Sequence, residues 1–205
     1  IGSSSGEAMI MGLTSLRADD FRMGGTTFDS ENGKDKNWQV SSAANDLKFE
    51  FKTKAGEDIV IDINSKAGDD IEELATYING QSDKVNASVT GDGRIQFFIS
   101  EPDLEGELSV SGSLASELGI DSTGREVTVE DISMMTVAGS QNAISVIDAA
   151  MNYVDSQRAD LGAKQNRLSH SINNLANIQE NVESSNSRIK DTDFAKETTQ
   201  MTRAQ

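Results

Sequence analysis

Clustered carboxylates are the residues of this sequence best suited to chemistry. Asp69, Asp70, Glu72 and Glu73 lie within five positions of one another, where they could bind a metal ion or act as an acid pair. They also precede an apolar series with helical spacing. The helix dipole and the free N–H groups favour carboxylates at a helix N-terminus, so we predict that this cluster caps a helix.

Other catalytic residue types are scarce. The chain has no cysteine and one histidine, His170, which nearly excludes thiolate sites, multi-histidine metal sites and most histidine-centred catalysis. His170 lies two residues past the apolar Leu168, so we expect it on the outer face of a helix. Asn86-Ala87-Ser88 is a formal glycosylation triplet, of a kind that is frequent by chance. We predict no enzyme activity, no catalytic residue, no cofactor and no metal.

The charge balance excludes several partners. The 205 residues carry 34 acidic and 18 basic side chains, a net charge of −16. Such a chain repels nucleic acid and anionic membranes, because binding to phosphate relies on lysine and arginine. No apolar run of about 18 residues is present to span a membrane, and no cleavable signal peptide is visible. Two stretches of the sequence carry regular patterns: a block of alternating residues and a long helical region.

Residues 46–137 predict a small α+β domain. Leu47, Phe49 and Phe51 alternate with polar residues and, after a turn, so do Ile59, Ile61 and Ile63, which indicates a hairpin. A helix over residues 71–78 is predicted next, capped by Asp69 with Glu72 and ended by Gly80. Further strands are expected over 85–89, 95–99 and 108–110, with a tight turn at 91–93. A helical turn at 114–118 ends at Gly119, and Val127 and Val129 suggest a last strand. Residues 1–45 look irregular, with a possible strand at 7–11 and turns at 22–25 and 31–34.

The most informative pattern begins at Gln141. Apolar residues recur there at steps of three and four over about six heptads, which predicts a helix roughly 60–65 Å long. We expect it to end or loosen at 184–187 and a second helix to start near Phe194. The apolar seam comprises Ile144, Ile147, Met151, Val154, Leu161, Leu168, Ile172, Leu175 and Val182, interrupted by the polar Arg158, Gln165 and Gln179.

This seam needs a partner. A single amphipathic helix cannot bury its own stripe, and the α+β block is too compact to cover all of it. The helix therefore requires other long helices, from the same chain or from another subunit. The polar seam residues suggest a specified register, because polar core positions trade stability for specificity. The alternative is an ordinary buried core helix, although helices in globular domains average about three turns.

The C-terminal third resembles a known family. Residues 154–163, 165–168 and 187–195 (VDSQRADLGA, QNRL and SRIKDTDFA) resemble the C-terminal region of bacterial flagellins. Residues 62–120, with AGDD at 67–70, resemble a repeat found in variable regions of flagellins and of related hook proteins. Residues 1–11 are similar to the hairpin that follows the N-terminal helices. The middle sequence is most similar to polar flagellins of marine gamma-proteobacterial type.

The resemblance implies a structural subunit of the bacterial flagellar filament that self-assembles for swimming motility. It implies three regions: a D1 hairpin and connection (1–45), a variable D2-like α+β domain (46–137), and the long D1 helix with the start of the D0 connection (138–205). The implied partners are other flagellin subunits, N-terminal helices that we expect to be missing here, the export chaperone and the filament cap. Toll-like receptor 5 is a further implied partner, with Ile147, Met151 and Arg167 as receptor-facing residues. The implied location is extracellular.

Three other functions stay open on sequence alone. A hook–filament junction or cap protein would also suit the repeat at 62–120, although the motifs from 154 to 195 favour flagellin. An enzyme would require something like the metalloprotease insert of some flagellins, which needs two histidines on one helix. A surface adhesin could act through residues 46–137.

Overall fold

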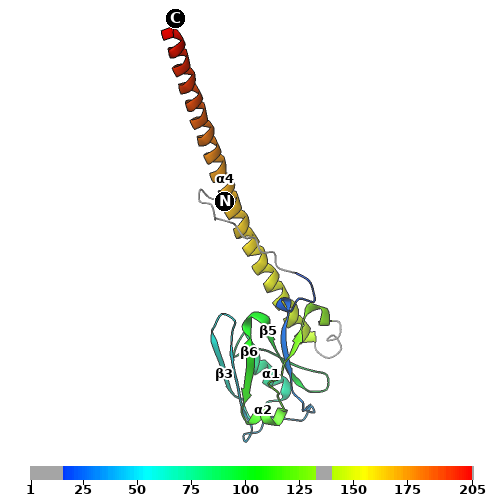
Figure 1. The fold of residues 1–205 in the computed structure, drawn as a ribbon. Coiled ribbons are helices and arrows are strands. Elements are labelled where there is room, and N and C mark those ends of the chain that lie inside the picture. The colour runs from blue at the N-terminus through cyan, green and yellow to red at the C-terminus, as the bar shows by residue number, and fades with distance from the viewer. Residues whose placement is uncertain (1–15, 133–139, 205) are drawn as a thin grey trace. The chain divides into compact units, whose positions relative to one another are not determined.

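The computed structural model describes residues 16–132 and 140–204. Contacts between Cα atoms divide the described chain into two compact units, one within residues 14–156 and one, the helical unit, from residue 157 onward. The first unit contains the described strands and the short helices, and a single long helix, α4 (Ser140–Ala204), starts in it and continues through the second (Figure 1). This mixed α+β architecture with a long C-terminal helix confirms the predicted fold class.

Two antiparallel sheets form the first unit. One has the order β4-β5-β1-β7 and the other β3-β2-β6. The strands are β1 (Gly25–Asp29), β2 (Asp46–Lys52), β3 (Asp58–Asn64), β4 (Asn86–Val89), β5 (Ile95–Ser100), β6 (Glu105–Ser111) and β7 (Arg125–Val127). The helices α1 (Ile71–Asn79) and α2 (Ser113–Leu118) and the 3-10 turns η1 (Phe21–Met23), η2 (Glu101–Asp103) and η3 (Val129–Asp131) connect them.

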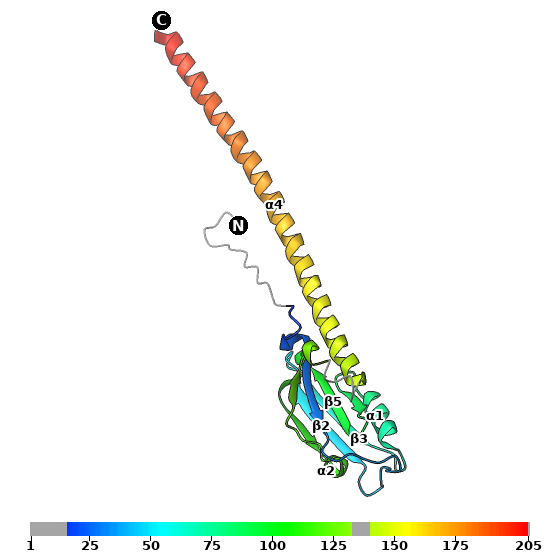
Figure 2. The ribbon, with the colours of Figure 1, turned by 90° about the vertical axis from the view of Figure 1, so that its right-hand side faces the viewer.

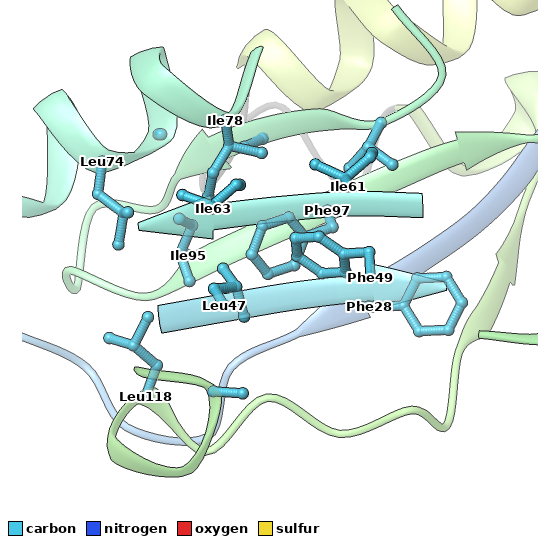
Figure 3. Packing of buried hydrophobic residues seen from close by; sticks show 14 of the residues in the cluster. Phe28, Leu47, Phe49, Ile61, Ile63, Leu74, Ile78, Ile95, Phe97 and Leu118 are labelled. Atoms are coloured by element: carbon cyan, nitrogen blue, oxygen red, sulfur yellow. The ribbon is translucent and has the colours of Figure 1, made fainter. Parts of the chain in front are cut away.

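One apolar core joins both sheets and both short helices. The predicted hairpin is β2 with β3, and its register places Leu47 opposite Ile63 and Phe49 opposite Ile61. Alternate residues therefore point to one face, where Phe49 meets Phe97 of the other sheet edge to face, with ring centroids 4.9 Å apart. Figure 3 shows these rings between the two sheets, with side chains of α1 and α2 around them. This aliphatic and phenylalanine core holds the unit together.

Helix α1 confirms the capping interpretation but shifts it by one residue. Asp70, not Asp69, is the N-cap: its side chain accepts a hydrogen bond from the Glu73 N–H, and the Glu73 side chain accepts one from the Asp70 N–H. Asp69 is held in the preceding turn, where its N–H donates to Lys66 and its carbonyl accepts from Val40. The prediction of Asp69 with Glu72 was therefore wrong. Gly80 ends the helix as predicted.

Strand β1 was not predicted from the sequence. It holds one large apolar residue, Phe28, and begins at the second of two glycines, 24 and 25, which suggest a turn. The glycines instead permit close backbone packing, because a Cβ at Gly24 would lie 1.9 Å from the Val127 carbonyl oxygen and one at Gly25 would lie 2.2 Å from that of Ile99. At the other end of the block, β7 stops at Val127, and Val129 lies in η3, so the predicted last strand was too long. The strand expected at 7–11 lies outside the described residues.

Helix α4 is longer than predicted. It runs without interruption from Ser140 to Ala204 (Figures 1 and 2). Its 65 residues correspond to roughly 98 Å at 1.5 Å per residue. The expected break at 184–187 and the second helix start near Phe194 were wrong. After Gly162 the helix contains no glycine or proline, so nothing forces a break. Low-propensity threonines bond back to the helix instead: Thr192 Oγ1 donates to the Arg188 carbonyl and Thr198 Oγ1 to that of Phe194, each at 2.7 Å.

Candidate assembly surface

The first turns of α4 bury one face in the α+β unit. Val146 is fully buried and packs in a cluster with Phe98 of β5 and Val127 of β7. Ala143 and Ala150, one turn before and after it, are also buried. Buried Asn142 donates from Nδ2 to Thr27 Oγ1 of β1 at 3.4 Å. The first turns of α4, residues 142–150, are therefore part of the core of this unit.

An aromatic residue and an arginine hold the next turn. The guanidinium of Arg22 lies 6.0 Å from the ring centroid of Tyr153, within the range of a cation–π interaction. Arg22 also pairs with Asp20 at 2.7 Å. Its hydrogen bond with Asp20 raises the pKa of Arg22 above its ordinary value. These contacts hold this turn of α4 against η1.

A second face of the same turns is apolar and exposed. At 100° per residue, Ile144, Ile147 and Met151 lie about 100–160° around the helix from Val146. Their exposed fractions are 57%, 42% and 59%. The helix thus buries one stripe in its own unit and leaves another uncovered. An ordinary core helix would bury these large apolar residues, so the arrangement favours a seam that packs against other helices.

Along the helix this exposed face continues as one column with a strict seven-residue repeat. The column consists of Ile147, Val154, Leu161, Leu168, Leu175, Val182 and Ile189. A straight α-helix drifts by about 20° per heptad, so a seven-residue apolar repeat sustained over this length is typical of helices that pack in a left-handed supercoil. The apolar column ends at Ile189, because the next two positions of the repeat hold the charged residues Lys196 and Arg203.

The predicted seam residues all lie on α4. Seven are exposed in this chain, and Val154 and Leu168 are partly buried; the exposed ones are Ile144, Ile147, Met151, Leu161, Ile172, Leu175 and Val182. Sequence reasoning missed four further exposed apolar residues of the helix, Ile178, Ile189, Phe194 and Met201. Ile189 would have been found by extending the heptad one step, but the break expected at 184–187 prevented it.

Polar residues interrupt or flank the column. Arg158, Gln165 and Gln179 are exposed, and Gln179 Nε2 donates to Glu183 at 3.0 Å. Lys164 pairs with Asp160 one turn away at 2.7 Å. Arg167, the third of the predicted receptor-facing residues with Ile147 and Met151, is exposed, as is His170. The exposed helix therefore offers apolar and hydrogen-bonding groups together.

The acidic cluster at α1 borders a cleft of about 700 Å³, which residues 34–36 and the β4–β5 turn also line. Two of the carboxylates that line the cleft are held by hydrogen bonds. Asp70 caps α1, and Asp92 accepts a hydrogen bond from Thr90 and pairs with Arg94 at 2.9 Å. The hydrogen bond from Thr90, with a contribution from Arg94, lowers the pKa of Asp92. Across the described residues, no three His, Cys, Asp or Glu side chains gather to hold a metal ion.

The fold and the column define a class: a chain with an α+β unit and a long helix that presents a heptad repeat of mostly exposed apolar residues. Within residues 16–132 and 140–204, no helix is long and apolar enough to cross a membrane. Residues 144–205 match the bacterial flagellin C-terminal helical region, and residues 46–101 match the flagellin hook IN motif. The chain belongs to the flagellin family and is of the polar flagellin type.

Curated relatives agree over the full chain. It is 69% identical to flagellin A of Vibrio anguillarum, 67% to polar flagellin C of Vibrio parahaemolyticus and 66% to flagellin A of Vibrio cholerae. It covers 100% of its own length in each comparison but 54%, 55% and 54% of theirs, so it spans about half of the relatives it matches. Among solved structures, the flagellar cap protein FliD D1-D2-D3 domains from Escherichia coli align with 68% of this chain and 62% of that one. The identity is 16% and the TM-score 0.34, too low to carry an argument.

Proposed function

We propose that this chain is part of a structural, non-enzymatic subunit of the bacterial flagellar filament, which assembles outside the cell through its long helix and serves swimming motility. The observation that carries the proposal is the exposed heptad column of α4, from Ile147 to Ile189. The family membership and the names of the relatives support it.

The energetics favour a polymer over a simple pair. Fully burying a large aliphatic side chain contributes about 1.5–3 kcal/mol, so covering the exposed half of seven such residues yields on the order of 7 kcal/mol. Bringing two proteins together costs about 4–15 kcal/mol in lost freedom. One column contact is therefore marginal. A subunit whose helix meets several neighbours at once gains that energy repeatedly, which suits a filament.

The heptad column of α4 also suggests which partners the chain binds. We propose that the column packs against N-terminal helices of the same protein and against helices of neighbouring subunits, and that the export chaperone and filament cap bind the subunit before and during assembly. Recognition by Toll-like receptor 5 is a further proposal, with exposed Ile147, Met151 and Arg167 as the contact residues on this chain.

Sedimentation and electron microscopy test the proposal. The full-length protein is compared with the 205-residue chain under filament-promoting conditions. Filaments from the full-length protein and none from the shorter chain are the expected result, because the shorter chain carries the column without the rest of its partners. If the full-length protein forms no filaments, the proposal fails, and a hook–filament junction, cap or adhesin role takes its place.

A further inference from the structure

The net charge of the chain is confined to one unit. Residues 14–156 hold 27 acidic and 11 basic side chains, a net charge of −16. Residues 157–205, the helical unit, hold six acidic and seven basic side chains, a net charge of +1. Residues 157–205, which contain five of the seven column residues, are thus almost neutral, while the α+β unit is strongly acidic.

Ion pairs within the α+β unit occupy most of its cations, so most of its unpaired charges are carboxylates. At least eight of its 11 basic side chains pair with carboxylates of the same unit, for example Lys54 with Glu101, Lys84 with Asp103 at 3.0 Å and Lys48 with Glu50 at 2.8 Å. These eight cations are therefore neutralised within the unit itself. Exposed carboxylates with no ion pair among the described contacts remain on several elements, including Glu72 of α1, Glu105 and Glu107 of β6 and Glu126 of β7.

We propose that the α+β unit is an electrostatic spacer, whose copies repel one another in the assembly, so that dissolved cations set the strength of assembly by screening that repulsion. The inference rests on the proposed filament function. The near-neutral helical unit can pack closely, and each packed copy brings a unit of charge −16 near its neighbours. The Debye length falls from about 30 Å at 10 mM salt to about 3 Å at 1 M, so low salt leaves this repulsion unscreened.

Charge substitutions in the full-length protein test the spacer. One variant carries E31Q, E72Q, E105Q, E107Q and E126Q, all at exposed positions, and changes the charge of the unit from −16 to −11. Repulsion scales roughly with the square of charge, so it falls to about half. The matched control carries Glu→Asp at the same five positions and keeps the charge. A second variant, K36E with K66E, changes two exposed lysines and brings the charge to −20.

The readout is the critical concentration for filament formation between about 10 mM and 0.5 M NaCl. We expect the Gln variant to assemble at roughly fivefold lower concentration than wild type in low salt, the Lys→Glu variant to require more protein, and the Glu→Asp control to match wild type. These differences should shrink to less than about twofold in high salt. Filaments with the same salt dependence in all four proteins would overturn the spacer and leave the filament function standing. Absence of filaments in all four at every salt concentration would overturn both.

Discussion

The side chain of Asn79 closes the outer edge of one sheet, and its removal is a sharp test of the fold. Asn79 is the last residue of α1, and β4 is the edge strand beside it. Its Nδ2 donates to the Ala87 carbonyl at 2.8 Å, and its Oδ1 accepts from the Ala87 N–H at 2.6 Å. The carboxamide thus bonds the strand as a neighbouring backbone would, which protects an edge that could otherwise pair with another chain.

The magnitude follows from these two hydrogen bonds. Each contributes about 1 kcal/mol net, and Ala87 is only 3% exposed, so its freed backbone groups gain little compensation from water. Asn79→Ala should lower the free energy of unfolding of the α+β unit by about 2–3 kcal/mol. For a domain of this size that corresponds to a fall in Tm of roughly 5–10 °C.

Asn79→Asp separates the two bonds. The carboxylate can still accept from the Ala87 N–H, but its other oxygen faces the Ala87 carbonyl, which raises the pKa of the new carboxyl in the folded state. The destabilisation should be greatest above that pKa and should shrink as pH falls through it, because the protonated group can again donate. Thr76→Ala on the same helix is the control: Thr76 Oγ1 bonds only its own helix, to the Glu72 carbonyl, so its removal should change stability by less than about 0.5 kcal/mol.

Fluorescence of the single tryptophan, Trp38, measures these effects during urea unfolding. Its Nε1 donates to Glu117 of α2 at 2.9 Å, so its emission reports whether this unit is folded. An Asn79→Ala variant as stable as Thr76→Ala would refute the argument that the carboxamide closes the strand edge.

Three further predictions concern the same unit. Gly24→Ala should destabilise it by more than about 3 kcal/mol in urea unfolding, because the Val127 carbonyl lies where the new Cβ would sit; a loss below about 1 kcal/mol would contradict that packing. Ser65→Ala should be neutral or stabilising by up to about 1 kcal/mol in thermal unfolding, since the Ser65 hydroxyl is buried without a described hydrogen-bond partner; a clear loss would reveal a partner. A hydrogen bond from the Ser113 hydroxyl lowers the pKa of Asp46, so its stabilising effect is present above the unfolded-state pKa and is lost as pH falls through the folded value. Ser113→Ala should raise the pKa of Asp46, which NMR titration of its carboxyl measures; an unchanged pKa would refute the assignment.

Periodicity in the sequence predicted the elements that bury large apolar side chains. The β2–β3 hairpin, α1, the turn at 91–93 and the helix that ends at Gly119 follow from alternating or helical spacing, because burial selects residues at the period of the backbone. Strand β1 was not predicted because it lies between β5 and β7 and has one glycine and two threonines in place of an apolar alternation. Its position depends on residues about 70 and 100 positions later in the chain, which no local pattern contains.

Local signals also misplaced helix boundaries. Asp69 and Asp70 both suit an N-cap, but Asp70 forms the capping box with Glu73, while the Asp69 carbonyl accepts a long-range hydrogen bond from the Val40 N–H. The three serines and one asparagine at 184–187 weaken a helix without ending it, since neither residue type removes a backbone donor. The seam was visible because its heptad spacing is regular. That α4 also buries a different face, through Val146, against β5 and β7 could not be read from the seam itself.

The central claim, that the heptad column of α4 is the assembly face, is tested most directly by charging it in the full-length protein. Leu168→Glu with Leu175→Glu places two carboxylates in the column. His170→Glu with Asn177→Glu adds the same two carboxylates at the same spacing, about 200° around the helix. We expect the column variant to form no filaments by electron microscopy while Trp38 still reports a folded α+β unit, and the control to form filaments. Filaments from the column variant as abundant as those of wild type would contradict the account.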